Sequence, residues 1–455
     1  MATPVSMRRL MTFAALLTLW TAFAAFVLWG INRLPFHPDE STYIFMSRDF
    51  DLLVLDGNPS SLIWKPGQAV DAGMRYRLLD APLIRYLIGL SRSLVGHPAT
   101  QLPADWNWSA SWEANVRAGA LPSASLLFVA RLPAALLAAV APLLVFNLGR
   151  RLAGLATGLG AALLYALNSL ILLHTRRAMT EGPMLFFMLL AIWLVLRYPR
   201  RSLLLGLVSA LAVAAKLTNL ALLPVVILAL WTAPLSKESG RVSRPRQRAR
   251  ALLGFATAFA VTTFVLNPLL WGAPGAALRA MAHARLELLS AQTNALRSVA
   301  PDWVLPGFGS RLLATVYEVY VAPLAFKDVA NYAYQTQALE LSYLSVPLHH
   351  VLRFSSVTAS LGSGAVLLAL TLAGMAWGGL ALYRRQRSET LTLLWLWTLS
   401  TVAVLSTIPV LWQRYYLPLV PIISLWAAYG FGPLFVAAAH LLKSAWAGWR
   451  RYRES

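Results

Sequence analysis

The sequence predicts an all-α polytopic membrane protein with about ten transmembrane helices. Three observations lead to this fold class: 58% of the 455 residues are hydrophobic and 13% charged, several apolar runs are about 20 residues long, and basic residues gather between alternate runs. A helix of that length crosses a hydrocarbon core of roughly 30 Å. The chain has no cysteine, which excludes disulfides, thiolate metal sites and a cysteine nucleophile.

The first apolar run follows Arg8 and Arg9. We expect it to be a retained span, because the residues after it offer no small-residue cleavage site for a signal peptidase. The two runs that meet at Lys216 are short, so residues 202–233 form either two short spans or one kinked helix. The predicted spans are residues 10–30, 124–148, 152–173, 182–196, 202–215, 217–233, 251–270, 354–382, 390–411 and 415–441.

The distribution of charge predicts the orientation of these spans. Counted from a cytoplasmic N-terminus, the inner segments hold 20 of the 39 Lys and Arg residues but only three of the 18 Asp and Glu residues. Cytoplasmic loops retain basic residues, so this asymmetry predicts that both termini are cytoplasmic. The basic run from Lys237 to Arg250 then faces anionic lipid, and the net charge of +21 requires no nucleic acid as a partner.

Two large segments, residues 31–122 and 271–350, are predicted to lie outside the membrane, within one membrane-embedded domain that covers residues 1–455. The first contains leucines at helical spacing between Leu83 and Leu94 with interleaved arginines, a pattern typical of an amphipathic helix in the interface. The second is interpreted as a cover for donor and acceptor. Its aromatic residues are equally typical of a membrane-surface belt and of a substrate-lining surface. These residues are Trp303, Tyr317, Tyr320, Tyr332, Tyr334 and Tyr343.

An acid pair, Asp39 and Glu40, follows the first span directly, behind His37 and Pro38. One interpretation is that Asp39 caps a helix whose first turn carries Glu40. The other is a catalytic site, because further polar residues map to the same outer boundary. That polar set consists of Asp39, Glu40, Asp80, His174, Arg176, Arg177, Glu181, Lys216, Gln413 and Arg414.

Cations and acids at one membrane surface fit a reaction between a lipid-borne phosphate and a hydroxyl group. The cations stabilise charge on a phosphate leaving group, and a carboxylate accepts the proton of the attacking hydroxyl. One-step displacement at a sugar carbon inverts the anomeric centre. The same cations would also suit a transporter or flippase for a lipid-linked anion, or a glycan polymerase or ligase of related architecture.

Five motifs in order carry a resemblance to a known family. They are His37-Pro38-Asp39-Glu40 with Tyr43, Asp80-Ala81-Pro82-Leu83, the loop from Arg177 to Pro183, Lys216, and Arg414-Tyr415-Tyr416-Leu417-Pro418. In this order they resemble the GT-C glycosyltransferases, in particular the bacterial branch related to protein O-mannosyltransferases and to the lipid A aminoarabinose transferase. Ala81 stands where the aminoarabinose branch has lysine.

The resemblance implies a GT-C-like helix bundle that transfers a hexosyl or pentosyl group from a polyprenyl-phosphate carrier to a lipid, glycan or protein acceptor. It implies an active site on the outer face of the cytoplasmic membrane, with Asp39 as general base. A divalent cation on Asp39, Glu40 and Glu181 stays open as a cofactor. The predicted catalytic residues are Asp39, Glu40 and Glu181, and the predicted residues for substrate and donor phosphate are Asp80, Arg176, Arg177, Lys216, Arg414 and Tyr415.

Overall fold

The computed structural model describes residues 4–233, 244–327, 332–351, 357–384 and 388–432. These residues form helices joined by loops and turns, and the β-structure among them is an isolated bridge between Val304 and Val410. The predicted all-α fold class is therefore confirmed.

Every predicted span coincides with a helix or a pair of helices. In chain order these are α1 (Pro4–Trp29), α7 (Ala124–Ala153), α8 (Leu155–Ala166) with α9 (Ser169–His174), α10 (Glu181–Arg197), α11 (Ser202–Ala215), α12 (Leu223–Thr232), α13 (Arg244–Leu266), α17 (Val357–Tyr383), α18 (Glu389–Leu405) and a final helix, Leu419–Gly432. Residues 433–441 of the last predicted span lie outside the described residues.

Four helices in the described part of the chain are long and apolar enough to cross a membrane by themselves. They contain the stretches Ala14–Arg33, Ala124–Ala153, Pro245–Leu266 and Ser360–Tyr383. The other apolar helices are shorter, because polar residues interrupt them. Lys216 has extended backbone, so α11 ends there and a 3-10 turn, Leu217–Leu222, leads into α12. Residues 202–233 therefore form two helices.

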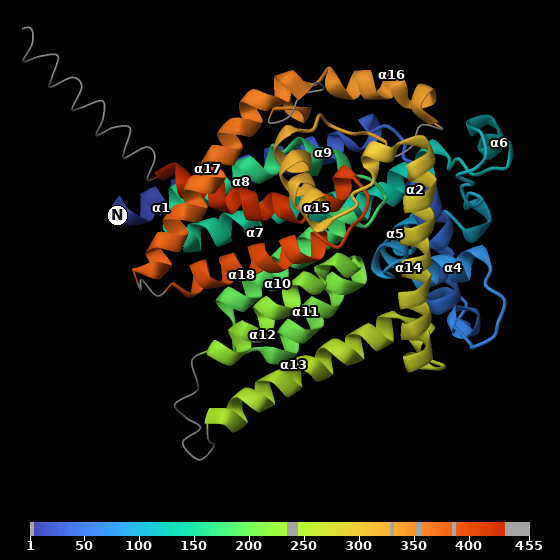
Figure 1. The fold of residues 1–455 in the computed structure, drawn as a ribbon, viewed down its shortest axis with the longest axis horizontal. Coiled ribbons are helices and arrows are strands. Elements are labelled where there is room, and N and C mark those ends of the chain that lie inside the picture. The colour runs from blue at the N-terminus through green and yellow to red at the C-terminus, as the bar shows by residue number, and fades with distance from the viewer. Residues whose placement is uncertain (1–3, 234–243, 328–331, 352–356, 385–387, 433–455) are drawn as a thin grey trace, which may run out of the picture.

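Helices α7, α11 and α12 pack on α10, α8 packs on α7, and α13 packs on α11 (Figure 1). Gly182, at the start of α10, lies so near the Ala134 carbonyl of α7 that a Cβ atom would come within 2.7 Å of it. Gly206 of α11 meets the backbone of α13 in the same way. Small residues allow helices in a membrane to approach closely, which maximises van der Waals contact between them.

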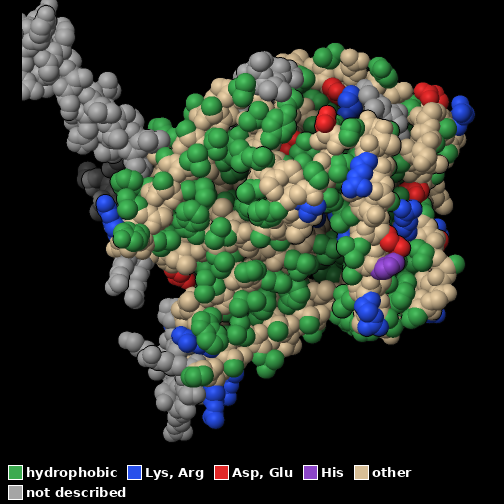
Figure 2. Space-filling model, in the orientation of Figure 1, with side chains coloured by type: hydrophobic (Ala, Val, Ile, Leu, Met, Phe, Trp, Pro, Cys, Tyr) green, Lys and Arg blue, Asp and Glu red, His purple; other side chains and the backbone are tan. Residues whose placement is uncertain are grey.

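The two outer segments lie together at one side of the bundle, at the right and top of Figure 1. The first outer segment, residues 31–122, contains α2 (Pro38–Met46), α3 (Arg48–Phe50), α4 (Ala72–Leu79), α5 (Leu83–Leu94) and α6 (Trp112–Arg117). The second, residues 271–350, contains α14 (Pro274–Val299), α15 (Phe308–Val316) and α16 (Ala333–Leu344). Helix α14 packs on α4, and Figure 2 shows charged side chains along α14 beside the largely hydrophobic bundle.

The predicted amphipathic helix forms as α5, but its arginines point into the first outer segment. Arg85 Nε lies 3.3 Å from Asp49 Oδ2, and Arg92 pairs with Asp51. The same buried side of α5 also carries Ile84 and Ile88, whereas Leu90 and Leu94 are exposed. The acids of residues 49–51 therefore neutralise these arginines inside the segment, and the location of α5 in the membrane interface stays a prediction.

Candidate active site

Asp39 lies in the first turn of α2, immediately after the end of α1 and its short connection. His37 is the N-cap: its Nδ1 accepts a hydrogen bond from the Asp39 backbone N–H at 3.2 Å. Glu40 Oε2 accepts reciprocally from the His37 backbone N–H at 3.1 Å. The interpretation of Asp39 as the cap is therefore wrong, and its carboxylate is available for other contacts.

The Asp39 carboxylate contacts Arg414, which is 375 residues away in the sequence. Arg414 Nη1 donates to Asp39 Oδ2, and the Asp39 side chain keeps 21% of its surface exposed. Arg414 lies in the 3-10 turn Gln413–Tyr416. Gln413 fixes this turn to the second outer segment, because its Nε2 donates to the Pro323 carbonyl and its Oε1 accepts from the Ala325 N–H.

A second ion pair joins Glu181 to Lys216. Glu181 is the first residue of α10 and Lys216 follows the last residue of α11, and their Oε1 and Nζ atoms lie 2.7 Å apart. Glu181 is buried, and its Oε2 has no hydrogen-bond partner in the described residues. The Tyr415 ring lies between the two cations, 5.2 Å from Lys216 Nζ and 5.7 Å from the Arg414 guanidinium carbon. We call Asp39, Glu181, Lys216, Arg414 and Tyr415 the polar cluster.

Two residues of the first outer segment border the polar cluster. Asp80 follows the last residue of α4, and burial together with the negative charge of Asp39 raises its pKa to about 6. Tyr43 lies one turn after Asp39 on α2. Burial raises the pKa of Tyr43 well above its usual range, and the charges of Asp80, Asp39 and Glu181 raise it further. Tyr43 was not predicted as a site residue, although its i+4 spacing from Asp39 places both on one helix face.

Glu40 lies in a different environment from its neighbour Asp39. It is completely buried, and Arg131 of α7 donates Nε to Oε1 at 2.7 Å and Nη2 to Oε2 at 2.6 Å. The Ala178 N–H also donates to Oε1. Burial tends to raise the pKa of Glu40, but Arg131 outweighs it and the pKa falls below its ordinary value. Arg131 was missed, although an arginine inside an apolar run signals a buried acidic partner.

Arg176 and Arg177 are buried and contact the second outer segment. Arg176 donates Nη2 to the Tyr343 hydroxyl at 2.9 Å, and its guanidinium lies over the rings of Phe26 and Tyr343. Arg177 Nη2 donates to the Phe326 carbonyl at 2.8 Å. The structure thus brings Asp39, Glu181, Lys216, Arg414 and Tyr415 together with Asp80 beside them, whereas Glu40, Arg176 and Arg177 form buried contacts elsewhere.

The three predicted carboxylates do not form a metal site. Each has its own cation: Arg414 for Asp39, Arg131 for Glu40 and Lys216 for Glu181. Across the described ranges, no three His, Asp or Glu side chains gather closely enough to hold a metal ion. The donor set is therefore that of an ion-pair network.

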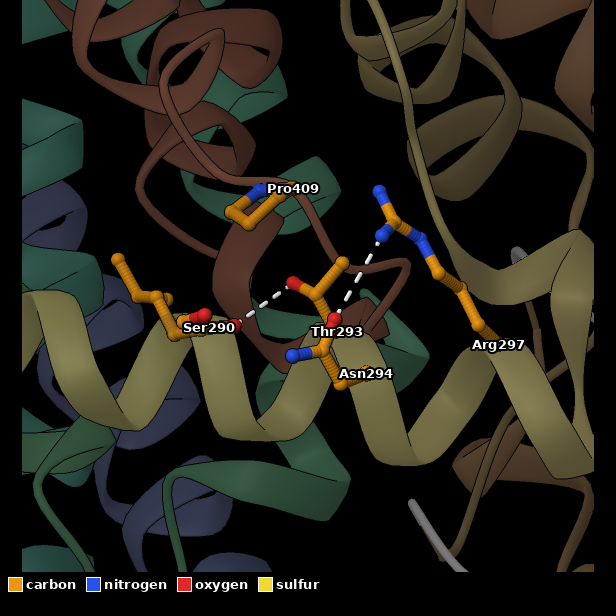
Figure 3. Close-up of a pocket in the computed structure, with 6 residues that line it drawn as sticks. Ser290, Thr293, Asn294, Arg297 and Pro409 are labelled. Carbon is orange, nitrogen blue, oxygen red and sulfur yellow. Dashed lines mark hydrogen bonds between the residues drawn. The ribbon is translucent and has the colours of Figure 1, made fainter.

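A shallow cavity of about 250 Å³ lies between one face of α14 and Pro409 (Figure 3). It is lined by Leu289, Ser290, Thr293, Asn294, Arg297 and Pro409. Pro409 belongs to the segment that precedes Arg414, and this segment pairs with the second outer segment: the Leu305 N–H donates to the Pro409 carbonyl at 2.8 Å. None of the predicted site residues lines the cavity.

Comparison with known proteins adds independent information on this fold. The sequence model of the family described as dolichyl-phosphate-mannose-protein mannosyltransferase matches residues 73–270. No curated protein matches the chain.

Several solved structures share the arrangement of helices. The apo oligosaccharyltransferase of Archaeoglobus fulgidus superposes with a TM-score of 0.50 at 13% identity, covering 94% of this chain and 52% of that one. The same protein with Zn and sulfate gives 0.48 at 14% identity, covering 94% and 51%. The chain thus spans about half the length of these structures, and the likeness at this identity concerns the fold. The chain is thus similar to the mannosyltransferase family over residues 73–270, and to the apo oligosaccharyltransferase in the fold of its helices.

Proposed function

We propose that this protein is an inverting glycosyltransferase that uses a sugar on a polyprenyl-phosphate carrier. The observation that carries the proposal is the polar cluster: a partly exposed carboxylate, Asp39, lies beside two cations, Lys216 and Arg414, on either side of one tyrosine ring. All of these residues lie at ends of helices. A general base next to a phosphate-binding pair of cations is what direct transfer from a sugar phosphate requires.

In the proposed reaction, the hydroxyl oxygen of the acceptor forms a bond to C1 of the sugar while the bond from C1 to the phosphate oxygen breaks. The electron pair of the broken bond stays on the polyprenyl phosphate. The proton of the hydroxyl goes to the Asp39 carboxylate. Attack opposite the leaving phosphate inverts the anomeric centre.

The cations have the task of stabilising the charge that develops on the phosphate. A guanidinium carries five N–H donors, so Arg414 can contact Asp39 and a phosphate oxygen together. Lys216 serves as a compact positive charge beside it. Glu181 keeps Lys216 in place with one oxygen, and its other oxygen can accept a hydrogen bond from a sugar hydroxyl.

The remaining predicted residues receive supporting roles. We assign Asp80 and Tyr43 to the rim of the substrate site, because the charge of Asp39 in the polar cluster raises the pKa of both. Glu40 acts as a positioning residue that holds the start of α2 on Arg131. Arg176 and Arg177 hold the second outer segment over the helices instead of binding the donor phosphate.

The proposed carrier is supported by the family match, and the proposed location by the distribution of charge. The name of the matching family includes a dolichyl phosphate donor, which is a polyprenyl-type phosphate. The acceptor is a lipid, a glycan or a protein. The excess of basic residues in the predicted inner loops supports an active site on the outer face of the cytoplasmic membrane, with cytoplasmic termini.

A transporter or flippase for a lipid-linked anion is the alternative from another class. Transporter sites lie near the bilayer midplane on broken helices. The polar cluster instead gathers residues from the first turn of α2, the start of α10, the end of α11 and the turn before the final helix. A glycan polymerase or ligase would share the cations but transfer a whole chain.

The test is transfer by the purified full-length protein in lipid nanodiscs from radiolabelled polyprenyl-phosphate monosaccharides. We expect Asp39→Asn to lower turnover by about 10²–10⁴-fold, because it removes the basic carboxylate and nearly conserves its shape. Its melting temperature should stay close to that of the unmodified protein, since Asp39 is partly exposed. Undiminished transfer by this variant would refute the assignment of the base. Absence of turnover with any monosaccharide donor would refute the proposed function.

A further inference from the structure

Trp108 of the first outer segment exposes an aromatic ring near Asp39. Its side chain is 38% exposed, and its ring contacts His37 and Tyr332 at centroid distances of 6.4 and 6.5 Å. His37 and Tyr332 contact each other edge to face at 5.8 Å. Tyr332 comes from the second outer segment, so three rings from two segments form an aromatic wall.

Hydrogen bonds between Asn107 and Asn115 hold the turn that carries Trp108. The Asn107 N–H donates to Asn115 Oδ1 at 2.8 Å, and Asn115 Nδ2 donates back to the Asn107 carbonyl at 2.9 Å. Asn107 Oδ1 also accepts from the Ser109 N–H at 2.9 Å. Asn115 is 1% exposed, so these hydrogen bonds are shielded from water. The backbone on either side of Trp108 is therefore held in place, and the indole stays partly exposed although burial of its apolar area would be favourable.

The aromatic wall adjoins the proposed base. His37 Nδ1 lies 3.9 Å from Asp39 Oδ2, and Asp39 in turn contacts Arg414. The wall is built from the outer segments, whereas the cations come from the end of α11 and the turn before the final helix. A base faces the acceptor hydroxyl and the cations face the leaving phosphate, so the wall lies on the acceptor's side.

We propose that Trp108, packed against the buried rings of His37 and Tyr332, binds a sugar ring of the acceptor, which makes the acceptor a glycan or a glycolipid headgroup. This inference rests on the proposed function. The face of an aromatic ring is electron-rich, and it attracts the slightly positive C–H groups on one face of a pyranose. A rigid exposed indole presents such a face without ordering a loop on binding.

Binding can be measured apart from turnover, by saturation-transfer NMR of the methyl glycosides of mannose, glucose and galactose with the full chain in nanodiscs. We expect at least one glycoside to bind, and Trp108→Ala to weaken its binding by about five- to tenfold. Trp108→Leu, which keeps apolar bulk, should weaken it as much, whereas Trp108→Phe should keep most of it. The control is Trp377→Ala on α17, where a tryptophan that is 49% exposed lies on an apolar helix.

Two results would overturn the inference: none of the glycosides binds, or Trp108→Ala and Trp108→Leu bind them like the unmodified protein. In the transfer assay, Trp108→Ala should raise the KM for a disaccharide acceptor and leave the KM for the donor unchanged. The inference is also wrong if only a Ser/Thr peptide accepts the sugar and Trp108→Ala leaves the KM for that peptide unchanged. Asp39→Asn separates the two proposals, because it should abolish transfer while glycoside binding persists.

Discussion

Asp39 and Glu40 are adjacent in the sequence, yet they belong to two different regions of the molecule. Asp39 is partly exposed and makes its ion pair with one nitrogen of Arg414. Glu40 is fully buried and accepts from two nitrogens of Arg131 and two backbone N–H groups. One carboxylate thus keeps an accessible surface for a substrate, while the other has its hydrogen-bonding capacity filled by the protein.

The same contrast holds for the cations. Lys216 and Arg414 keep 18% and 11% of their side-chain surface exposed, whereas Arg131, Arg176 and Arg177 are buried. We call Glu40, Arg131, Arg176 and Arg177 the buried anchor. A buried charge without its partner is strongly destabilising, while an exposed pair contributes little to stability. Mutations should therefore act on activity in the polar cluster and on stability in the buried anchor.

The largest effect on stability is expected for Glu40→Gln. Glutamine keeps one acceptor oxygen where Glu40 has two, so it can accept from only one of the backbone N–H groups of His37 and Ala178, and it leaves the charge of Arg131 buried and unpaired. We expect a loss of about 3–5 kcal/mol in the free energy of unfolding. The measurement is the melting temperature of the purified protein in detergent.

Asp39→Asn is the matched control, one residue away, and it should leave the melting temperature nearly unchanged. Glu40→Gln combined with Arg131→Met should recover part of the loss, because Arg131 is then no longer a buried charge without its partner. If Glu40→Gln melts like the unmodified protein but loses transfer, Glu40 takes part in the chemistry and the comparison above fails.

A smaller effect is expected for Gly30→Ala, which tests the part of the buried anchor around Arg176. A Cβ atom at residue 30 would overlap the Arg176 guanidinium. That group is held between the rings of Phe26 and Tyr343, so it cannot move without losing both contacts. We expect a loss of about 1–3 kcal/mol in the free energy of unfolding. Limited proteolysis should also cut residues 305–350 faster.

Gly160→Ala serves as the control for the added methyl group. Its Cβ atom would meet only the Ala428 side chain at 3.5 Å, an ordinary contact, on a helix that favours alanine over glycine. Equal melting temperatures and equal cleavage rates for Gly30→Ala and Gly160→Ala would show that Arg176 does not hold the second outer segment.

The helices could be predicted from the sequence because apolar runs and charge asymmetry are local signals. The order of the motifs also resembled the family type whose sequence model matches residues 73–270. The alternative at 202–233 required the structure, since only the extended backbone at Lys216 shows that the chain forms two helices. The ion pairs of the α5 arginines could not be predicted, because their acidic partners at Asp49 and Asp51 lie more than 25 residues earlier in the sequence.

At the candidate site, the ion-pair partners were what the sequence could not predict. Spacing along the chain cannot pair Asp39 with Arg414 or Glu40 with Arg131, which lie 375 and 91 residues apart. Arg176 and Arg177 carried the same charge as Lys216, and only burial distinguishes the two sets. Tyr43 stood within a quoted motif, but its environment depends on acids from α4 and α10.

The smallest effect is expected for Asp80→Asn. This substitution tests whether the ionised carboxylate of Asp80 destabilises the folded protein, in contrast to the carboxylate of Glu40, which is paired. Burial, together with the charge of Asp39, raises the pKa of Asp80 from 3.8 to about 6 in the folded protein. The unfolded chain therefore loses this proton at lower pH than the folded protein does. The contribution of Asp80 to stability falls as pH rises from about 4 to about 6, and it stays low above that range.

Asparagine cannot ionise, so Asp80→Asn should be more stable than the unmodified protein at pH 7, by about 1–2 kcal/mol given the partial exposure of Asp80, and nearly equal to it at pH 4. Melting temperatures at the two pH values measure the difference. Asp302→Asn, at an exposed position, should follow the unmodified protein at both. Suppose that Asp80→Asn also has the melting temperatures of the unmodified protein at both pH values. Burial and the charge of Asp39 then do not destabilise ionised Asp80, and the contrast between the polar cluster and the buried anchor fails.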